Sequence, residues 1–172
     1  MLALFHVADP MHELLPKLFQ HGAMEDRKFF AGHLEYFLRQ MNTSAKRHLW
    51  DSWLQRYWRD RLQGVPAALD ESEIRQMLGW LPHLGELFPE AISLAIGAPT
   101  IRIQMEHSSP LFELNDSDLV TRYPDETAEL LIYLCNCVEA HHASDLRTVA
   151  TRLSTLAPDL QHRLDEALAR LG

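Results

Sequence analysis

The chain has 172 residues, of which 47% are hydrophobic, and this is enough for one domain with a full core. Its formal net charge of −8 argues against a general nucleic-acid binder, because such proteins usually carry a basic face. The two cysteines, at 135 and 137, are too close together for an ordinary structural disulfide, so we expect a reducing, cytoplasmic setting.

The sequence shows no segment that would direct the chain to a membrane. The first residues lack the basic start and long apolar core of a signal peptide. The richest apolar run, LLIYLCNCV at 130–138, is far shorter than the roughly 18 apolar residues of a membrane-spanning helix. We therefore expect neither a signal peptide nor a membrane span.

The apolar residues recur with a helical period, beginning with a helix or helix pair over 2–21 that Gly22 closes. A helix over 24–41 follows, and its predicted core stripe is Phe30, Leu34, Phe37, Leu38 and Met41. Cap-type side chains at 42–44 then open a helix around WDSWLQRYWRDR, at 50–61, which should end at Gly64.

The middle of the chain begins with Asp70 and Glu73, whose capping-box spacing opens a helix that Pro82 should end or bend. Pro89 suits the first turn of the next helix, which Gly97 follows. The segment 98–123 breaks the helical pattern. We interpret it as an ordered connection with one short helix after Asp116.

Three more helices are expected in the last part of the chain. The first runs from Pro124 to about His142 and is apolar on nearly all sides, which predicts the most buried helix. Ser144 or Asp145 caps the next helix, and Pro158 opens the last one. Their predicted core residues are Leu146, Val149, Ala150, Leu153, Leu160, Leu164, Leu168 and Leu171.

These elements predict an all-α fold, an irregular stack of antiparallel helices. Short paired helices with prolines at the turns are typical of the helical hairpins of HEAT and armadillo repeats. No Gly/Ser linker divides the chain, so we expect a single domain over residues 1–172, with 98–115 as the best candidate for a weak break.

One segment, CNCVEAHH at 135–142, carries ligand types that zinc prefers. On a helix Cys137 and His141 would share one face, whereas Cys135 and Cys137 would point about 200° apart. Any further ligands would have to come from distant histidines. The alternative is that both cysteines fill the core and that the histidines lie at the helix end.

No recognisable catalytic motif organises the remaining polar residues. The ten histidines form no H-E-x-x-H pattern, no G-x-S-x-G nucleophile motif occurs, and the seven glycines form no phosphate-binding loop. We therefore predict no catalytic residue.

The tryptophan-rich helix at 50–61 has two distinct faces. Its predicted apolar face comprises Trp50, Trp53, Leu54, Tyr57, Trp58 and Leu62, and its polar face includes Arg56 and Arg59. Tryptophan and arginine can bind nucleic acid, but base-stacking rings need exposure in a positive groove. Packing in the core is the favoured interpretation, and the large rings would also suit contacts with a neighbouring domain.

The order of aromatic residues, leucines and prolines from Trp50 onward resembles a known family. The motifs are W-x2-W-x3-Y-W-x2-R at 50–61, E-x3-M-L-x-W-L at 73–81, FPEAI at 88–92 and the closing LxxLxPxLxxxLxxALxxLG. They are similar to a C-terminal helical domain of unknown function on large sirtuin-domain bacterial proteins, several linked to anti-phage defence. The resemblance covers about residues 45–172 and implies no catalytic residue. A sirtuin-type NAD site would lie outside this chain, which would be a fragment or a stand-alone relative.

Two functional readings follow. The first is a non-catalytic helical interaction or sensor module with protein partners, homo-oligomers included, and no cofactor. Its candidate contact residues are Trp50, Trp53, Arg56, Trp58 and Arg59. The alternative is a small zinc-dependent enzyme or zinc-stabilised protein that uses Cys137 and His141. Nucleic acid is not expected as a partner; binding through Arg56 and Arg59 would weaken steeply with salt.

Overall fold

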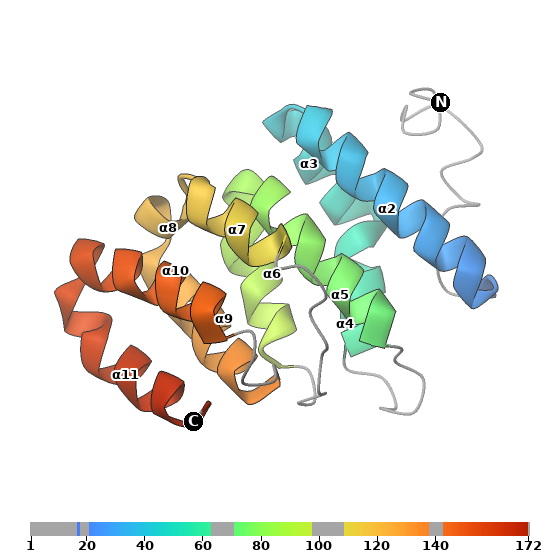
Figure 1. Ribbon diagram of the computed structural model, residues 1–172. Coiled ribbons are helices and arrows are strands. Elements are labelled where there is room, and N and C mark those ends of the chain that lie inside the picture. The colour runs from blue at the N-terminus through green and yellow to red at the C-terminus, as the bar shows by residue number, and fades with distance from the viewer. Residues whose placement is uncertain (1–16, 18–20, 63–70, 98–108, 138–142, 172) are drawn as a thin grey trace.

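The computed structural model describes residues 17, 21–62, 71–97, 109–137 and 143–171, which form helices joined by turns (Figure 1). No strand occurs among these residues, so the all-α prediction is confirmed. None of their helices is both long and apolar enough to cross a bilayer. The α-helices are α2 (Met24–Gln40), α3 (Thr43–Leu49), α4 (Gln55–Leu62), α5 (Glu71–Trp80), α6 (Phe88–Ala95), α7 (Ser109–Asp116), α8 (Leu119–Arg122), α9 (Pro124–Cys137), α10 (Ala143–Leu156) and α11 (Gln161–Ala169).

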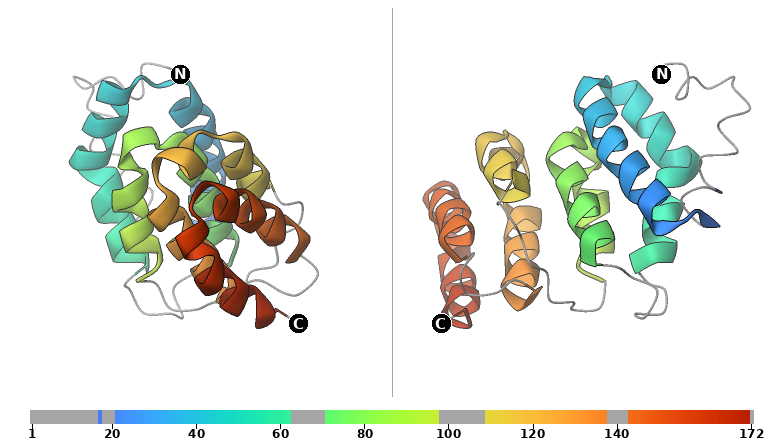
Figure 2. Two further views of the ribbon diagram at one scale, coloured as in Figure 1. Left: turned by 90° about the vertical axis from the view of Figure 1, so that its left-hand side faces the viewer. Right: turned by 45° about the vertical axis from the view of Figure 1, so that its right-hand side comes forward.

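The helices stack in layers from one end of the molecule to the other (Figure 2). Helices α2, α3 and α4 lie at one end, and α10 and α11 lie at the other. Several packing partners are distant in sequence, since α2 packs along α5, and α10 packs against α7 as well as against its neighbours α9 and α11. The predicted irregular stack is therefore confirmed.

Local signals in the sequence account for several helix ends. Asn42 caps α3, because its side-chain oxygen accepts a hydrogen bond of 2.9 Å from the Ala45 amide. Pro89 lies in the first turn of α6, as predicted. Helix α5 ends at Trp80, and Pro82 lies in the short 3₁₀ turn η4 (Leu81–His83) that follows. The predicted helix end at Gly64 lies outside the described residues.

A single wide turn interrupts the tryptophan-rich helix. The backbone of η2 (Trp50–Leu54) is π-helical, and the amide of Gln55 donates to the carbonyl of Trp50, five residues earlier. The sequence pattern did not predict this turn, because a continuous α-helix already places the apolar residues on one face. Helices α3 and α4 nevertheless continue each other through it (Figure 1).

The interpretation of segment 98–123 needs one correction. Residues 109–116 form helix α7 and are not a connection, and Leu111 and Leu114 of this helix are buried. The eight residues hold only three large apolar side chains, Leu111, Phe112 and Leu114, which is too weak a periodic pattern to predict a helix. The short helix expected after Asp116 is confirmed as α8. Residues 98–108, including IRIQM, lie outside the described part of the chain.

The C-terminal helices follow the predicted apolar pattern. Most of α9 is buried, from Thr127 to Cys137, which agrees with its predicted central position. The predicted extension of this helix to His142 lies outside the described residues. The predicted core residues between Leu146 and Leu171, in and beside α10 and α11, are buried or, for Leu168, partly buried. One continuous apolar cluster reaches from Ala31 to Leu171.

Candidate interaction surface

The three tryptophans of the tryptophan-rich helix lie inside the molecule. Trp50, Trp53 and Trp58 are between 0 and 4% exposed, so the predicted core face is confirmed. Trp50 meets Trp58 edge to face at 5.7 Å, and Trp58 stacks on Trp80 at 6.1 Å between ring centroids. Buried rings cannot contact a partner in this fold, and the contact role predicted for Trp50, Trp53 and Trp58 does not fit the structure.

Hydrogen bonds from two indole groups connect helices across this core. Trp50 Nε1 donates to Glu90 of α6 at 3.0 Å, and Arg47 donates to the same carboxylate at 2.6 Å. Trp80 Nε1 donates to the Ala31 carbonyl of α2 at 3.0 Å. These bonds fix the orientation of the rings, since a buried indole N–H without an acceptor would be costly.

The two candidate arginines of this helix remain on the surface. Arg56 and Arg59 are exposed, and Arg56 lies 3.6 Å from Asp60. Nearby, Arg47 lies 3.6 Å from Asp51. Charges of both signs therefore alternate on this face, which fits a solvated helix surface better than a basic groove for nucleic acid.

A buried ionic cluster centres on Glu73, which is only 4% exposed. Arg61 donates two hydrogen bonds to its carboxylate, at 2.7 and 2.6 Å, and Tyr57 Oη donates a third at 2.6 Å. Arg27 of α2 lies 3.6 Å away. Burial, and then the charge of Glu73, raise the pKa of Tyr57. The cluster connects α2, α4 and α5, and sequence reasoning took Glu73 only for a residue that favours the start of a helix.

The proposed zinc ligands are not brought together in the described residues. Cys137 is buried in α9, and His141 lies outside the described part of the chain. Burial raises the pKa of Cys135 to about 11, which keeps this thiol protonated at neutral pH. Both cysteines occupy the apolar cluster, as the core-filling alternative expected.

A polar cluster that sequence reasoning missed joins α2, η4 and α7. Its members Glu35, His83 and Glu113 place ligand-type atoms within 4.8 Å of one another. Arg39 donates to Glu35 at 2.8 Å and to Glu113 at 2.5 Å. The guanidinium already compensates both carboxylates, and a metal ion would have to displace it. We therefore interpret the cluster as an ionic connection between helices.

His83 is the titratable centre of this polar cluster. Its Nε2 lies 2.8 Å from Glu113, an arrangement that by itself favours the protonated ring. Burial, followed by the charge of Arg39, outweighs that effect and lowers the pKa of His83. The ring is thus held mainly neutral at physiological pH.

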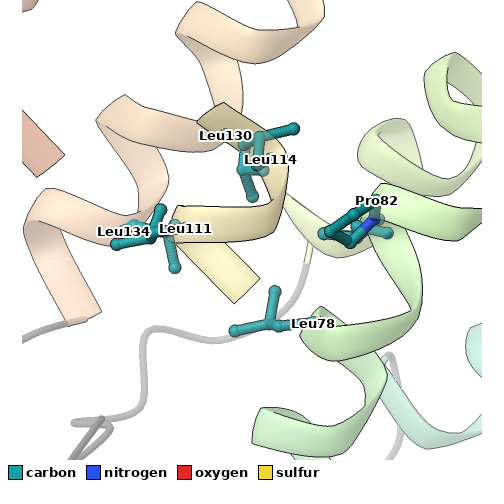
Figure 3. A pocket seen from close by; sticks show the side chains of 7 residues that line it. Leu78, Pro82, Leu111, Leu114, Leu130 and Leu134 are labelled. Carbon is teal, nitrogen blue, oxygen red and sulfur yellow. The ribbon is translucent and has the colours of Figure 1, made fainter. Parts of the chain in front are cut away.

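Two hollows of the described part of the chain offer little for a ligand. A cavity of about 10 Å³ has room for about one water, yet its lining is apolar, formed by Leu78, Leu81, Pro82, Leu111, Leu114, Leu130 and Leu134 (Figure 3). A groove of about 590 Å³ runs between α10 and α11. The hydroxyls of Thr151 and Thr155 in this groove donate to carbonyls of their own helix, at 2.8 and 3.0 Å. A groove with such a polar lining is typical of the outer face of a terminal helical layer.

The most distinctive surface feature is the outer face of α2, which we define as Phe29, Gly32, His33 and Tyr36. Phe29 and Tyr36 are each 61% exposed, on the side of the helix opposite the buried Leu34 and Leu38. The His33 ring lies over Phe29 with 4.2 Å between ring centroids, and His33 Nδ1 lies 2.8 Å from the Phe29 carbonyl. The Phe29 ring is thus held in position by His33 while most of it stays exposed to solvent.

A sequence signal for this face exists. Phe29 and Tyr36 are seven residues apart, two helical turns, and both fall outside the predicted core stripe of their helix. Large apolar residues out of register with a core stripe indicate a second contact surface.

Comparison with known proteins gives one match. A family model described as a domain of unknown function (DUF4020) matches residues 6–160, which include all the helices from α2 to α10. No curated protein and no solved structure matches the chain. The chain therefore belongs to the DUF4020 family, whose function is unknown.

Proposed function

We propose that this domain is a non-catalytic helical interaction module that binds a protein partner through the outer face of α2. The observation that supports the proposal most strongly is the paired exposure of Phe29 and Tyr36 on one side of a helix at the end of the stack (Figure 1). Aromatic residues concentrate the binding energy of protein interfaces, whereas exposed to water they contribute little to the stability of the domain.

The restricted conformation of the side chains on this face also supports the proposed function. The contacts between Phe29 and His33 restrict both rings before any partner arrives. A partner would then lose less conformational freedom from these side chains on binding. The proposed contact replaces the tryptophan face of the sequence-based hypothesis, since those rings are buried.

The biological setting belongs to the same proposal. The resemblance to the C-terminal domain of large sirtuin-domain proteins supports a role as one module of a bacterial anti-phage defence assembly. Two buried thiols support a reducing cytoplasm as the compartment. In this role the module uses no cofactor, and the catalytic part would lie in a partner or in another domain.

Photo-crosslinking in the native cells tests the proposed surface. A benzophenone amino acid replaces Tyr36 in one variant and Arg56, exposed on a different helix, in the control. We expect a discrete protein adduct from position 36 and none from position 56. Equal adducts from both positions, or none from position 36, would contradict the proposed contact face.

A further inference from the structure

We propose that the outer face of α2 binds the same face of a second copy of this chain. The two helices run antiparallel, and a two-fold axis crosses between them level with Gly32 and His33. This inference rests on the proposed function and names the partner. It is carried by three properties of α2: the spacing of its aromatic residues, an otherwise unexplained glycine, and opposite charges at its two ends.

The aromatic residues are placed symmetrically about the proposed axis. Phe29 and Tyr36 lie seven residues apart, which corresponds to about 10.5 Å along the helix at 1.5 Å per residue. Gly32 and His33 lie midway between them. In an antiparallel pair centred there, Phe29 of each copy faces Tyr36 of the other, and the same aromatic contact occurs twice.

Gly32 is difficult to explain from the contacts of a single chain. It lies inside a 17-residue helix, where a glycine makes the helix less stable than an alanine would. Among the described residues, no heavy atom lies within 4 Å of a Cβ atom built at this position, so their packing does not require glycine here. At 100° per residue, Gly32 lies on one flank of the aromatic face and His33 on the other. The two-fold axis therefore sets glycine against glycine, where two helix backbones can approach closely.

The charges of α2 favour the antiparallel direction. Glu25 and Asp26 lie in the first turn, and Arg39 lies in the last. Arg39 keeps 41% of its side chain exposed while it binds Glu35 and Glu113. Glu25 lies 3.6 Å from Lys28 of its own helix but is 87% exposed. Antiparallel pairing brings this carboxylate near Arg39 of the other copy, whereas parallel pairing would set Glu25 against Glu25 and Arg39 against Arg39. The helix dipoles also oppose each other in this arrangement.

A contact made by one helix from each copy is small compared with a standard protein interface. We therefore expect a weak dimer in exchange with the monomer. Its affinity should depend strongly on the two aromatic residues at its centre, because few other side chains contribute.

Sedimentation equilibrium of the full chain, from about 1 µM to about 1 mM, measures this association. We expect the average mass to rise from the monomer value of 19.8 kDa toward twice that value as concentration increases. Tyr36→Ser should weaken association roughly tenfold or more, since it removes two aromatic contacts per dimer. Leu156→Ser is the matched control, because Leu156 is 46% exposed on α10, at the other end of the stack, and its loss should leave association unchanged.

Two substitutions of Gly32 test the geometry of the contact. A Cβ atom at position 32 meets none of the described residues, but a leucine side chain there would separate the paired helices. With Gly32→Leu the fold should therefore persist while association weakens at least about tenfold. Gly32→Cys should oxidise to a disulfide-linked dimer, because the axis brings the two backbones within the range a disulfide bridges. The buried Cys135 and Cys137 should not interfere.

A chain that stays at the monomer mass at every concentration would overturn this inference. A dimer that Leu156→Ser weakens as much as Tyr36→Ser, or in which Gly32→Cys forms no disulfide, would overturn it as well. A monomer whose position 36 crosslinks to a different protein would leave the proposed function standing. A monomer without any adduct from position 36 would overturn both proposals.

Discussion

Replacing Glu73 by alanine should be among the most destabilising changes in the described part of the chain. This carboxylate accepts hydrogen bonds from Tyr57 Oη at 2.6 Å and from two nitrogens of Arg61, at 2.7 and 2.6 Å. Glu73→Ala leaves the Arg61 side chain, which is only 14% exposed, without its anionic partner. It also removes the acceptor of the buried Tyr57 hydroxyl.

The expected loss follows from these contacts. Removing one partner of a buried ion pair costs about 3–5 kcal/mol, because the remaining charge stays buried and uncompensated. That loss is a large share of the roughly 5–15 kcal/mol by which a domain is usually stable. Tyr57→Phe removes one hydrogen bond to a charged group but keeps the ion pair, and it should cost only about 1.5–3 kcal/mol.

Urea denaturation followed by tryptophan fluorescence measures both losses. Glu25→Ala is the matched control at a protein concentration low enough for the chain to be monomeric. This side chain is 87% exposed and lies 3.6 Å from Lys28, and its removal should change the free energy of unfolding by less than about 0.5 kcal/mol. A loss below about 1 kcal/mol for Glu73→Ala would refute the view that this cluster is a buried ionic connection among three helices.

Three further predictions concern individual side chains. Gly32→Ala should raise the free energy of unfolding of the monomer by about 0.5–1 kcal/mol, and a thermal melt at low protein concentration checks this; a loss would mean that the helix needs glycine for its own fold. Neither Cys135 nor Cys137 should react with a thiol reagent at neutral pH until the chain is unfolded, and rapid labelling of the native protein would contradict their burial. The lowered pKa of His83 means that the unfolded chain binds a proton more readily than the folded one. Stability should therefore fall as pH decreases below about 6.5, and His83→Asn should reduce that slope; an unchanged slope in denaturant titrations would argue against this origin.

The core of the molecule was largely predictable from the sequence. The apolar faces of α2, α9, α10 and the tryptophan-rich helix follow from a 3.6-residue period. The structure buries most of the residues that this period indicates, although Phe30 and Met41, at the two ends of the α2 stripe, are only partly buried. Helix α7 escaped prediction because eight residues with two buried leucines carry too little periodic signal. The π-helical turn at Trp50–Leu54 could not be predicted either. A single wide turn adds one residue to the helix and leaves the order of apolar residues in the sequence unchanged.

The polar clusters could not be predicted, because their members come from distant parts of the chain. Glu113 and Arg39 lie 74 residues apart, and only the packing of α7 near α2 brings them together. The burial of Glu73 could not be predicted for a related reason. A glutamate in the first turn of a helix is common at the surface, and no neighbouring residue in the sequence indicates that this one is buried. The outer face of α2 could have been predicted from the positions of Phe29 and Tyr36. The tryptophans were predicted as contact residues instead, because they are large and have arginine neighbours.

Amide chemical shifts of the full chain, recorded by NMR from about 20 µM to about 1 mM, test the central claim most directly, because this range brackets weak association. If α2 is the contact face, the shifts that change with concentration should centre on Phe29, Gly32, His33 and Tyr36. Changes centred on Arg56 and Arg59, or on the groove between α10 and α11, would contradict that claim and would place the contact surface elsewhere.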